Sequence, residues 1–181
     1  MASMNNFEKI FVNYLNRLRV PPTVVRLLNK GNIQPTGTIL EIGAGLGYTS
    51  HAIFNKYHPS RIFICDFDAT QVERGKKLTR AKFGSMPPEF VYQREDVLNL
   101  SFNDESFDMV ISTLMFHHVE ENLRDFKKTP RGISEIQRVL KPGGIFFYWD
   151  IANQEKVEQL MHDAGYTTLL STRKQRVFQK P

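Results

Sequence analysis

Hydrophobic residues recur with two different periods along this chain. Near the amino terminus they are spaced so as to share one helical face, at Phe7, Phe11, Tyr14, Leu15 and Leu18. Pro21-Pro22 is expected to end that helix, because proline has no N–H to donate within an inner turn. A short apolar stretch, Val24–Leu28, follows before Gly31.

From residue 38 onward, short apolar runs alternate with helical patterns. Buried strands are predicted at Thr38–Ile42, Arg61–Cys65, Glu89–Arg94, Phe107–Ser112 and Gly144–Trp149. Their hydrophobicity is continuous rather than alternating, which is typical of strands covered on both faces in a parallel sheet. Two further strand-like stretches, Thr167–Ser171 and Arg176–Gln179, predict an antiparallel hairpin near the carboxyl terminus.

Helices are predicted in the intervals between these strands. Asp68, with Gln71 three residues later, resembles a capping box and predicts a helix over Ala69–Lys82. Thr129-Pro130 predicts an N-cap followed by proline in the first turn, for a helix that Lys141–Gly144 ends. A last helix is indicated by Val157, Leu160, Met161 and Ala164 and closed by Gly165. Alternating strands and helices predict an α/β fold with a doubly wound sheet.

Composition narrows the class of protein. The chain has 181 residues, 41% of them hydrophobic, which suits one ordinary domain with a buried core. The single cysteine, Cys65, cannot form an intrachain disulfide and is expected to be a small buried side chain. The longest apolar run, Ile145–Trp149, is far shorter than the roughly 20 residues that cross a bilayer. The first residues do not resemble a signal peptide, so we expect a cytoplasmic protein without a transmembrane segment.

Net charge is +5 at pH 7, which raises the question of an acidic partner. The lysines and arginines are distributed over three separate segments rather than one patch. This distribution favours a solvated surface over a nucleic-acid site.

A glycine-rich turn directly after the first predicted strand is the most informative segment. Gly43, Gly45 and Gly47 stand between that strand and a helix, where a ligand can approach the backbone closely. Asp66 lies 23 residues after Gly43, at the end of the second strand. A carboxylate at that position can accept both hydroxyls of a ribose. Together these features predict an adenosine-type cofactor.

The details of the turn distinguish between such cofactors. The pattern is G-x-G-x-G, and Tyr48 stands where the dinucleotide fingerprint has its third glycine. Glu41, two residues before the first glycine, would repel a pyrophosphate at the helix N-terminus. S-adenosyl-L-methionine has no phosphate and carries an ammonium and a sulfonium, so the charge of the site favours it.

The segment Glu41–Gly47 resembles motif I of the class I S-adenosylmethionine-dependent methyltransferases. Other motifs follow in the order of that family, at Asp66, Glu95-Asp96-Val97, Phe107–Ser112, Leu114–Val119 and Arg138–Gly144. They are similar to the type 11 branch, which includes the ubiquinone and menaquinone biosynthesis methyltransferases. The resemblance covers roughly residues 36–180.

The resemblance implies a Rossmann-like sheet of seven strands in the order 3-2-1-4-5-7-6, with strand 7 antiparallel. Residues 36–181 are expected to form the S-adenosylmethionine-binding domain, with residues 1–35 as a helical lid segment of the same single-domain protein.

The resemblance also implies which residues bind the cofactor: Glu41, Gly43, Gly45, Asp66, Phe67, Asp96, Val97 and Thr113. The two glycines would lie beside the methionine part, with Glu41 near its amino group. Asp66 would hold the ribose hydroxyls. Phe67 would lie against the adenine, and Asp96 with Val97 would bracket it. Thr113 would lie beneath the cofactor.

His117 is the candidate for a catalytic residue facing the methyl acceptor, whereas the family often has a structural histidine at His118. Tyr14 or Tyr48 would place a ring near the sulfonium, although Tyr14 also suits a plain apolar helix face. Methyl transfer from a sulfonium is an in-line displacement that needs alignment first and a base only if the acceptor must lose a proton. No metal site is predicted.

Three classes of function are compatible with these residues. The leading one is a methyltransferase acting on a small-molecule acceptor, lipid-like molecules included. The second is a methyltransferase acting on RNA or protein, which the absence of the Asn/Asp-Pro-Pro-Tyr motif after the fourth strand disfavours. The third is a non-catalytic cofactor-binding scaffold, against which the intact set of cofactor residues argues.

The stretch between the fifth strand and the last helix, Asp150–Glu155, is very short, so residues 4–30 are the only obvious lid. Two interpretations stay open at this point. The pocket is open to a bulky substrate, or a second subunit completes it in a homo-oligomer.

Overall fold

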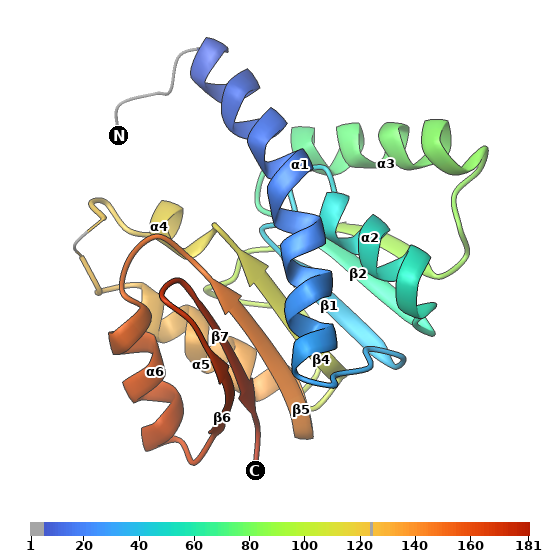
Figure 1. Cartoon of the computed structure of the whole chain (residues 1–181). Helices are drawn as coiled ribbons and strands as arrows, with labels where there is room; N and C mark the ends of the chain where they lie inside the picture. Colours follow the sequence, from blue (N-terminus) through green and yellow to red (C-terminus); the bar gives the residue numbers. More distant parts are fainter. Residues whose placement is uncertain (1–5, 124) are drawn as a thin grey trace.

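A single sheet of seven strands forms the centre of the protein (Figure 1). The computed structural model describes residues 6–123 and 125–181, with side chains from Leu18 onward. The strands are β1 (Thr38–Ile42), β2 (Arg61–Asp66), β3 (Phe90–Arg94), β4 (Phe107–Thr113), β5 (Leu140–Trp149), β6 (Thr167–Ser171) and β7 (Gln175–Gln179). They lie in the order β3-β2-β1-β4-β5-β7-β6, which confirms the predicted fold.

The pairing directions also agree with the prediction. Strands β1 to β5 run parallel to one another, with β1 between β2 and β4. Strand β7 is antiparallel to both β5 and β6, so the terminal hairpin is confirmed. Strand β5 begins at Leu140 rather than Gly144, with a register irregularity against β4 before Ile145.

Helices cover both faces of the sheet (Figure 1). They are α1 (Asn6–Lys30), α2 (Tyr48–Tyr57), α3 (Ala69–Phe83), α4 (Phe116–Val119), α5 (Thr129–Val139) and α6 (Gln154–Asp163). The first three pack on one face, where Ile39, Ile64 and Phe147 belong to one core cluster. The last three pack on the other, where Leu40, Val110 and Phe146 belong to a second cluster. No helix of the described residues is long and apolar enough to cross a membrane.

The expectation that Pro21-Pro22 ends the first helix is wrong. Helix α1 continues through both prolines to Lys30. Beyond the prolines it buries Val24 and Leu28 completely within the core. Burial of these side chains offsets the local cost of the prolines, so tertiary packing overrides the helix-breaking signal.

The helix caps agree only partly with prediction. Asp68 caps α3 as expected, but its carboxylate accepts from the backbone N of Thr70 at 2.8 Å, not from that of Gln71. The expectation that Thr129 is the N-cap of α5 is wrong, because Thr129 is already helical. The carboxylate of Glu120 instead accepts from the backbone N of Thr129 at 2.7 Å, so a remote side chain caps this helix.

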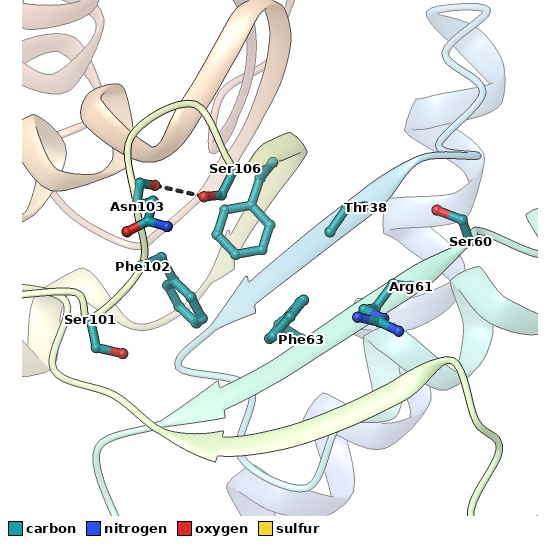
Figure 2. Close-up of a pocket in the computed structure, with 9 residues that line it drawn as sticks. Thr38, Ser60, Arg61, Phe63, Ser101, Phe102, Asn103 and Ser106 are labelled. Carbon is teal, nitrogen blue, oxygen red and sulfur yellow. Dashed lines mark hydrogen bonds between the residues drawn. The ribbon is translucent and has the colours of Figure 1, made fainter.

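The connection between β3 and β4 is the one parallel crossover that contains no helix. Residues 95–106, all of them described, form a loop with a single isolated bridge between Asp96 and Asn99. A crossover between parallel strands usually contains a helix that covers the sheet. Here the loop leaves a hollow of about 580 Å³ beside the first residues of β1, β2 and β4 (Figure 2).

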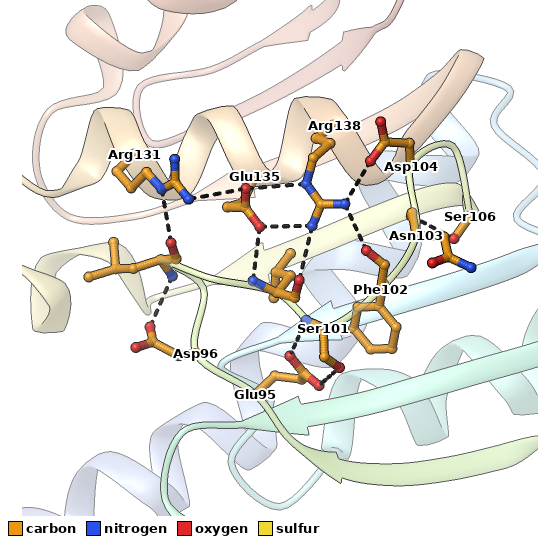
Figure 3. Close-up of polar contacts among 12 residues, drawn as sticks. Glu95, Asp96, Ser101, Phe102, Asn103, Asp104, Ser106, Arg131, Glu135 and Arg138 are labelled. Carbon is orange, nitrogen blue, oxygen red and sulfur yellow. Dashed lines mark hydrogen bonds and ion pairs between the residues drawn. The ribbon is translucent and has the colours of Figure 1, made fainter.

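Side chains of α5 hold this loop in place (Figure 3). The Arg138 guanidinium donates to the carbonyl oxygens of Leu100 at 3.0 Å and Phe102 at 2.7 Å, and pairs with Glu135 at 2.8 Å. The Glu135 carboxylate accepts in turn from the backbone N of Leu100. Arg131 donates to the carbonyl oxygen of Leu98 at 3.0 Å. The loop backbone thus finds hydrogen-bond partners that a helix would supply internally.

Replacing Arg138 should therefore destabilise the fold. Arg138→Ala leaves the buried Glu135 carboxylate and two carbonyl oxygens without their main donor, so we expect a loss of about 3 kcal/mol in the free energy of unfolding. Urea unfolding measures it. Arg131→Ala is the matched control, because that side chain is 60% exposed and should contribute less than about 1 kcal/mol. Equal losses in both variants would contradict this role of Arg138.

Candidate functional site

The glycine turn joins β1 to α2, and all three of its glycines have positive φ. A Cβ on Gly43 would collide with Met115, and a Cβ on Gly47 would come within 2.7 Å of the Tyr92 hydroxyl. Gly45 differs, because nothing lies within 4 Å of the position of its missing Cβ. Two glycines therefore admit protein side chains, whereas Gly45 faces open space that a ligand can enter.

Glu41 lies beneath this turn rather than in it. Its side chain is buried, and its carboxylate accepts from the backbone N of Ser50 at 2.9 Å and from the Ser50 hydroxyl. Burial raises the pKa of Glu41 to about 7, against the lowering effect of the Ser50 hydrogen bonds. The carboxylate ties the end of β1 to the first turn of α2, and its contact with a cofactor amino group stays a prediction.

Asp66, at the end of β2, reaches across to the same turn. One carboxylate oxygen accepts from the backbone N of Gly45 at 2.8 Å, and the other accepts from that of Asp68 at 3.0 Å. Each oxygen of a carboxylate can accept two hydrogen bonds. Asp66 therefore keeps one acceptor position on each oxygen, which matches the two hydroxyls of a ribose.

The three residues expected around the adenine lie after β2 and β3. Phe67 is 62% exposed, and the Arg94 guanidinium lies over its ring at 5.1 Å. Asp96 is half-buried and accepts from the backbone N of Leu98 at 2.9 Å. Val97 is buried within the core. Since Glu95 N donates to the carbonyl oxygen of Asp66, the two strand ends are adjacent.

A buried polar cluster, which the sequence did not indicate, supports the turn from below. His51 accepts or donates through Nε2 to the Thr79 hydroxyl at 2.7 Å, and Thr79 bonds to the Tyr92 hydroxyl at 2.6 Å. Burial lowers the pKa of His51 to about 4, so its ring is neutral at pH 7. Because the Tyr92 hydroxyl lies against Gly47, the cluster joins α2, α3 and β3 beneath the glycine turn.

His117 lies in α4, after the fourth strand, and is held by an acid that sequence reasoning missed. Its Nδ1 lies 2.8 Å from a carboxylate oxygen of Asp150, and its backbone N donates to the other oxygen at 3.2 Å. Asp150 is fully buried and also accepts from the backbone N of Ile151. A signal was available, because Asp150 directly follows β5 as Asp66 ends β2.

The remaining described candidates from the sequence lie near the same strand ends, with fewer contacts that point to a ligand. Thr113 is the last residue of β4, half-buried opposite Trp149 of β5. The His118 ring lies 4.0 Å from that of His117 and is exposed. Tyr48 begins α2 at the glycine turn. The side chain of Tyr14 lies outside the described residues.

The family model described as "Methyltransferase domain" matches residues 40–148, which is more than half of the chain. This chain belongs to the methyltransferase domain family. The family expected from the sequence is thereby confirmed.

Curated relatives agree with this assignment. The phthiotriol/phenolphthiotriol dimycocerosates methyltransferase of Mycobacterium tuberculosis is 29% identical over 72% of this chain and 44% of the relative. The ubiquinone/menaquinone biosynthesis C-methyltransferase UbiE of Paracoccus denitrificans is 27% identical over 59% of this chain and 39% of the relative. The chain thus spans less than half the length of these two relatives.

Solved structures share the fold of this chain at low sequence identity. A putative S-adenosyl-L-methionine-dependent methyltransferase from Methanococcus maripaludis superposes with a TM-score of 0.74 at 17% identity, covering 99% of this chain and 96% of the other. The PH0226 protein from Pyrococcus horikoshii gives a TM-score of 0.73 at 16% identity, covering 99% and 100%.

The residues around the glycine turn fit the S-adenosyl-L-methionine expected from the sequence. The open space beside Gly45 is a cradle that a Cβ would narrow, and the strand-end Asp66 beside it has one acceptor position per oxygen available. Phe67 directly follows Asp66 in the sequence, and its ring is exposed to solvent.

Stability should depend on pH through Glu41. Between its usual pKa of 4.5 and the folded value of about 7, only the folded state holds the proton. The free energy of unfolding should therefore fall as pH rises across this window, by roughly 3 kcal/mol at most. Glu41→Gln keeps an acceptor for Ser50 but removes the proton equilibrium, so urea unfolding should show a flatter dependence. Parallel profiles for variant and wild type would contradict the raised pKa.

Cofactor affinity should depend on Asp66. Asp66→Ala removes the acceptor for the ribose hydroxyls and for Gly45 N, so calorimetric titration should show S-adenosyl-L-methionine bound at least about tenfold more weakly. Asp68→Ala is the matched control two residues away, because it removes only the cap of α3. The Asp68→Ala variant should bind S-adenosyl-L-methionine as tightly as wild type does. Unchanged affinity in Asp66→Ala would exclude Asp66 from the site.

Proposed function

We propose that this protein transfers a methyl group from S-adenosyl-L-methionine to a small, partly apolar molecule that carries an ionisable hydroxyl. The observation that carries the proposal is the pairing of His117 with the buried Asp150. This pair follows β4 and β5, at the same edge of the parallel sheet where Gly45 and Asp66 follow β1 and β2. The histidine that would accept a proton and the carboxylate that would bind the ribose hydroxyls thus lie at the same end of the sheet.

Asp150 determines what His117 can do. With Nδ1–H donating to the carboxylate, the ring presents Nε2 as a free acceptor, which is the form that a general base requires. S-adenosyl-L-methionine, held beside Gly45 and Asp66, would supply an activated methyl group with a neutral thioether as its leaving group. His117 would take the hydroxyl proton of the acceptor, and Asp150 positions the His117 ring.

The surroundings of this pair favour an acceptor with an apolar part. Ile151, next to Asp150, is 48% exposed, and Leu123 is 52% exposed. Asn153 donates to the carbonyl oxygen of Leu123, so the two segments are neighbours. Exposed apolar side chains near a polar site are typical of a surface that meets an apolar ligand. The names of the relatives, which include a demethylmenaquinone methyltransferase, support a lipid-like acceptor.

We propose residues 36–181 as the cofactor-binding domain and residues 1–35 as the lid segment. Helix α1 supports this division only in part. Its carboxyl-terminal half belongs to the core through Val24 and Leu28, whereas its amino-terminal half projects beyond the sheet (Figure 1). The projecting half is therefore the part that would close over an acceptor.

Methyl transfer tests this function directly. The assay measures label passing from S-adenosyl-L-methionine into solvent-extractable product, with demethylmenaquinol as the first acceptor and with RNA and protein as alternatives. His117→Asn should lower kcat by about 100-fold, because a general base contributes on that order. Its affinity for S-adenosyl-L-methionine should equal that of wild type, since the cofactor groups are untouched.

Two further variants separate catalysis from structure. His162→Asn is the matched control, because His162 lies exposed in α6 and bonds to Thr168. Asp150→Asn should lower kcat with little change in KM, because it removes the carboxylate that orients the His117 ring. Full activity in His117→Asn would exclude the base. Transfer to RNA alone would favour a macromolecular acceptor, and cofactor binding without any transfer would favour a scaffold.

A further inference from the structure

We propose that the hollow at the amino ends of β1, β2 and β4 is a second ligand site, which binds an aromatic ring bearing an anionic group. The hollow has a volume of about 580 Å³, within the range of sites for small organic ligands. It is lined by Thr38, Ser60, Arg61, Phe63, Ser101, Phe102, Asn103, Ser106 and Phe107.

The wall of the hollow is aromatic. The rings of Phe63, Phe102 and Phe107 meet one another edge to face, with centroids 4.9 to 5.4 Å apart (Figure 2). Phe107 is buried, whereas Phe63 and Phe102 are only partly covered. Each partly covered ring can accept a further ring in stacked or edge contact, which is the favoured geometry between aromatic groups.

The rim supplies the charge that selects the ligand. Arg61, at the start of β2, is exposed, and within the described part of the chain its guanidinium has neither an ion pair nor a hydrogen bond. The exposed Ser60 and Asn103 add a hydroxyl and an amide to the same rim. An unpaired guanidinium beside partly exposed aromatic rings is complementary to an aromatic anion, because it binds carboxylate or sulfonate through parallel N–H groups.

The hollow is separate from the cofactor site. Arg61 is the first residue of β2 and Asp66 is the last, so the two sites lie at opposite ends of the same strand. A strand of this length spans roughly 17 to 20 Å. A ligand at Arg61 therefore does not occupy the space beside Gly45.

The site exists because the β3–β4 crossover has no helix, and its wall is fixed rather than loose. Arg138 holds the carbonyl oxygen of Phe102 at 2.7 Å and the carboxylate of Asp104 at 2.9 Å (Figure 3). Ser101 donates through its backbone N to Glu95 at 3.0 Å. These contacts order the loop wall before a ligand arrives, which lowers the entropic cost of binding.

Fluorescence titration with 8-anilinonaphthalene-1-sulfonate tests the proposal on the full chain. We expect saturable binding at one site, and the same affinity in the presence of saturating S-adenosyl-L-methionine. Arg61→Ala should weaken binding by about tenfold or more, and Arg61→Lys should restore part of it. Arg74→Ala is the matched control, because it removes an exposed arginine from α3. It should bind the probe like wild type.

Amide chemical shifts locate the bound probe independently of the variants. We expect probe-induced shifts at Ser101–Ser106 and not at Gly43–Gly47, with the thermal unfolding midpoint of Arg61→Ala unchanged. Displacement of the probe by S-adenosyl-L-methionine would overturn the proposal. So would equal binding by wild type and Arg61→Ala, or an equal loss in Arg61→Ala and Arg74→Ala. Neither titration depends on methyl transfer, so this result is independent of the acceptor.

Discussion

Carboxylates at the ends of parallel strands hold the functional end of this protein together. Glu41 at β1 accepts from Ser50 N, and Asp66 at β2 accepts from Gly45 N. Asp96 after β3 accepts from Leu98 N, and Asp150 after β5 accepts from His117 N. In each case the acid binds a backbone N–H of a loop or helix that follows a strand. Such charge-assisted hydrogen bonds are stronger than neutral ones, and they fix these loops and helix starts against the ends of the strands.

The same contacts give this end of the sheet its chemistry. Because parallel strands end at one edge, acids that follow different strands converge there, and the position between β2, β1 and β4 is the usual ligand crevice of doubly wound sheets. Glu41 is buried and serves the turn, whereas Asp66 keeps acceptor capacity for a ligand. Asp150 orients His117. One interaction type thus supports the glycine turn in one place and orients the histidine that we propose as the base in another.

At the amino ends of the strands, a loop held by side chains of a helix takes the place of a helical crossover. Without a helix between β3 and β4, the loop relies on Arg138 and Glu135 of α5 for its backbone partners. This arrangement leaves the rings of Phe63 and Phe102 partly uncovered and the guanidinium of Arg61 unpaired within the described residues. A hydrogen-bonded loop can be ordered without covering the sheet, and a hollow results.

Local patterns were sufficient for the approximate positions of the strands and for the glycine turn between β1 and α2. Continuous apolar runs and a glycine turn are short-range features, because a strand or a turn is encoded by neighbouring residues. Long-range contacts decided the rest. Pro21-Pro22 stays within α1 because Val24 and Leu28 are buried against the sheet, and Glu120 rather than Thr129 caps α5. The pairing of His117 with Asp150 spans 33 residues, and the hollow at Arg61 joins three strands and a loop. Such contacts depend on which segments the sheet order brings together. No local pattern in the chain specifies which distant segments become neighbours.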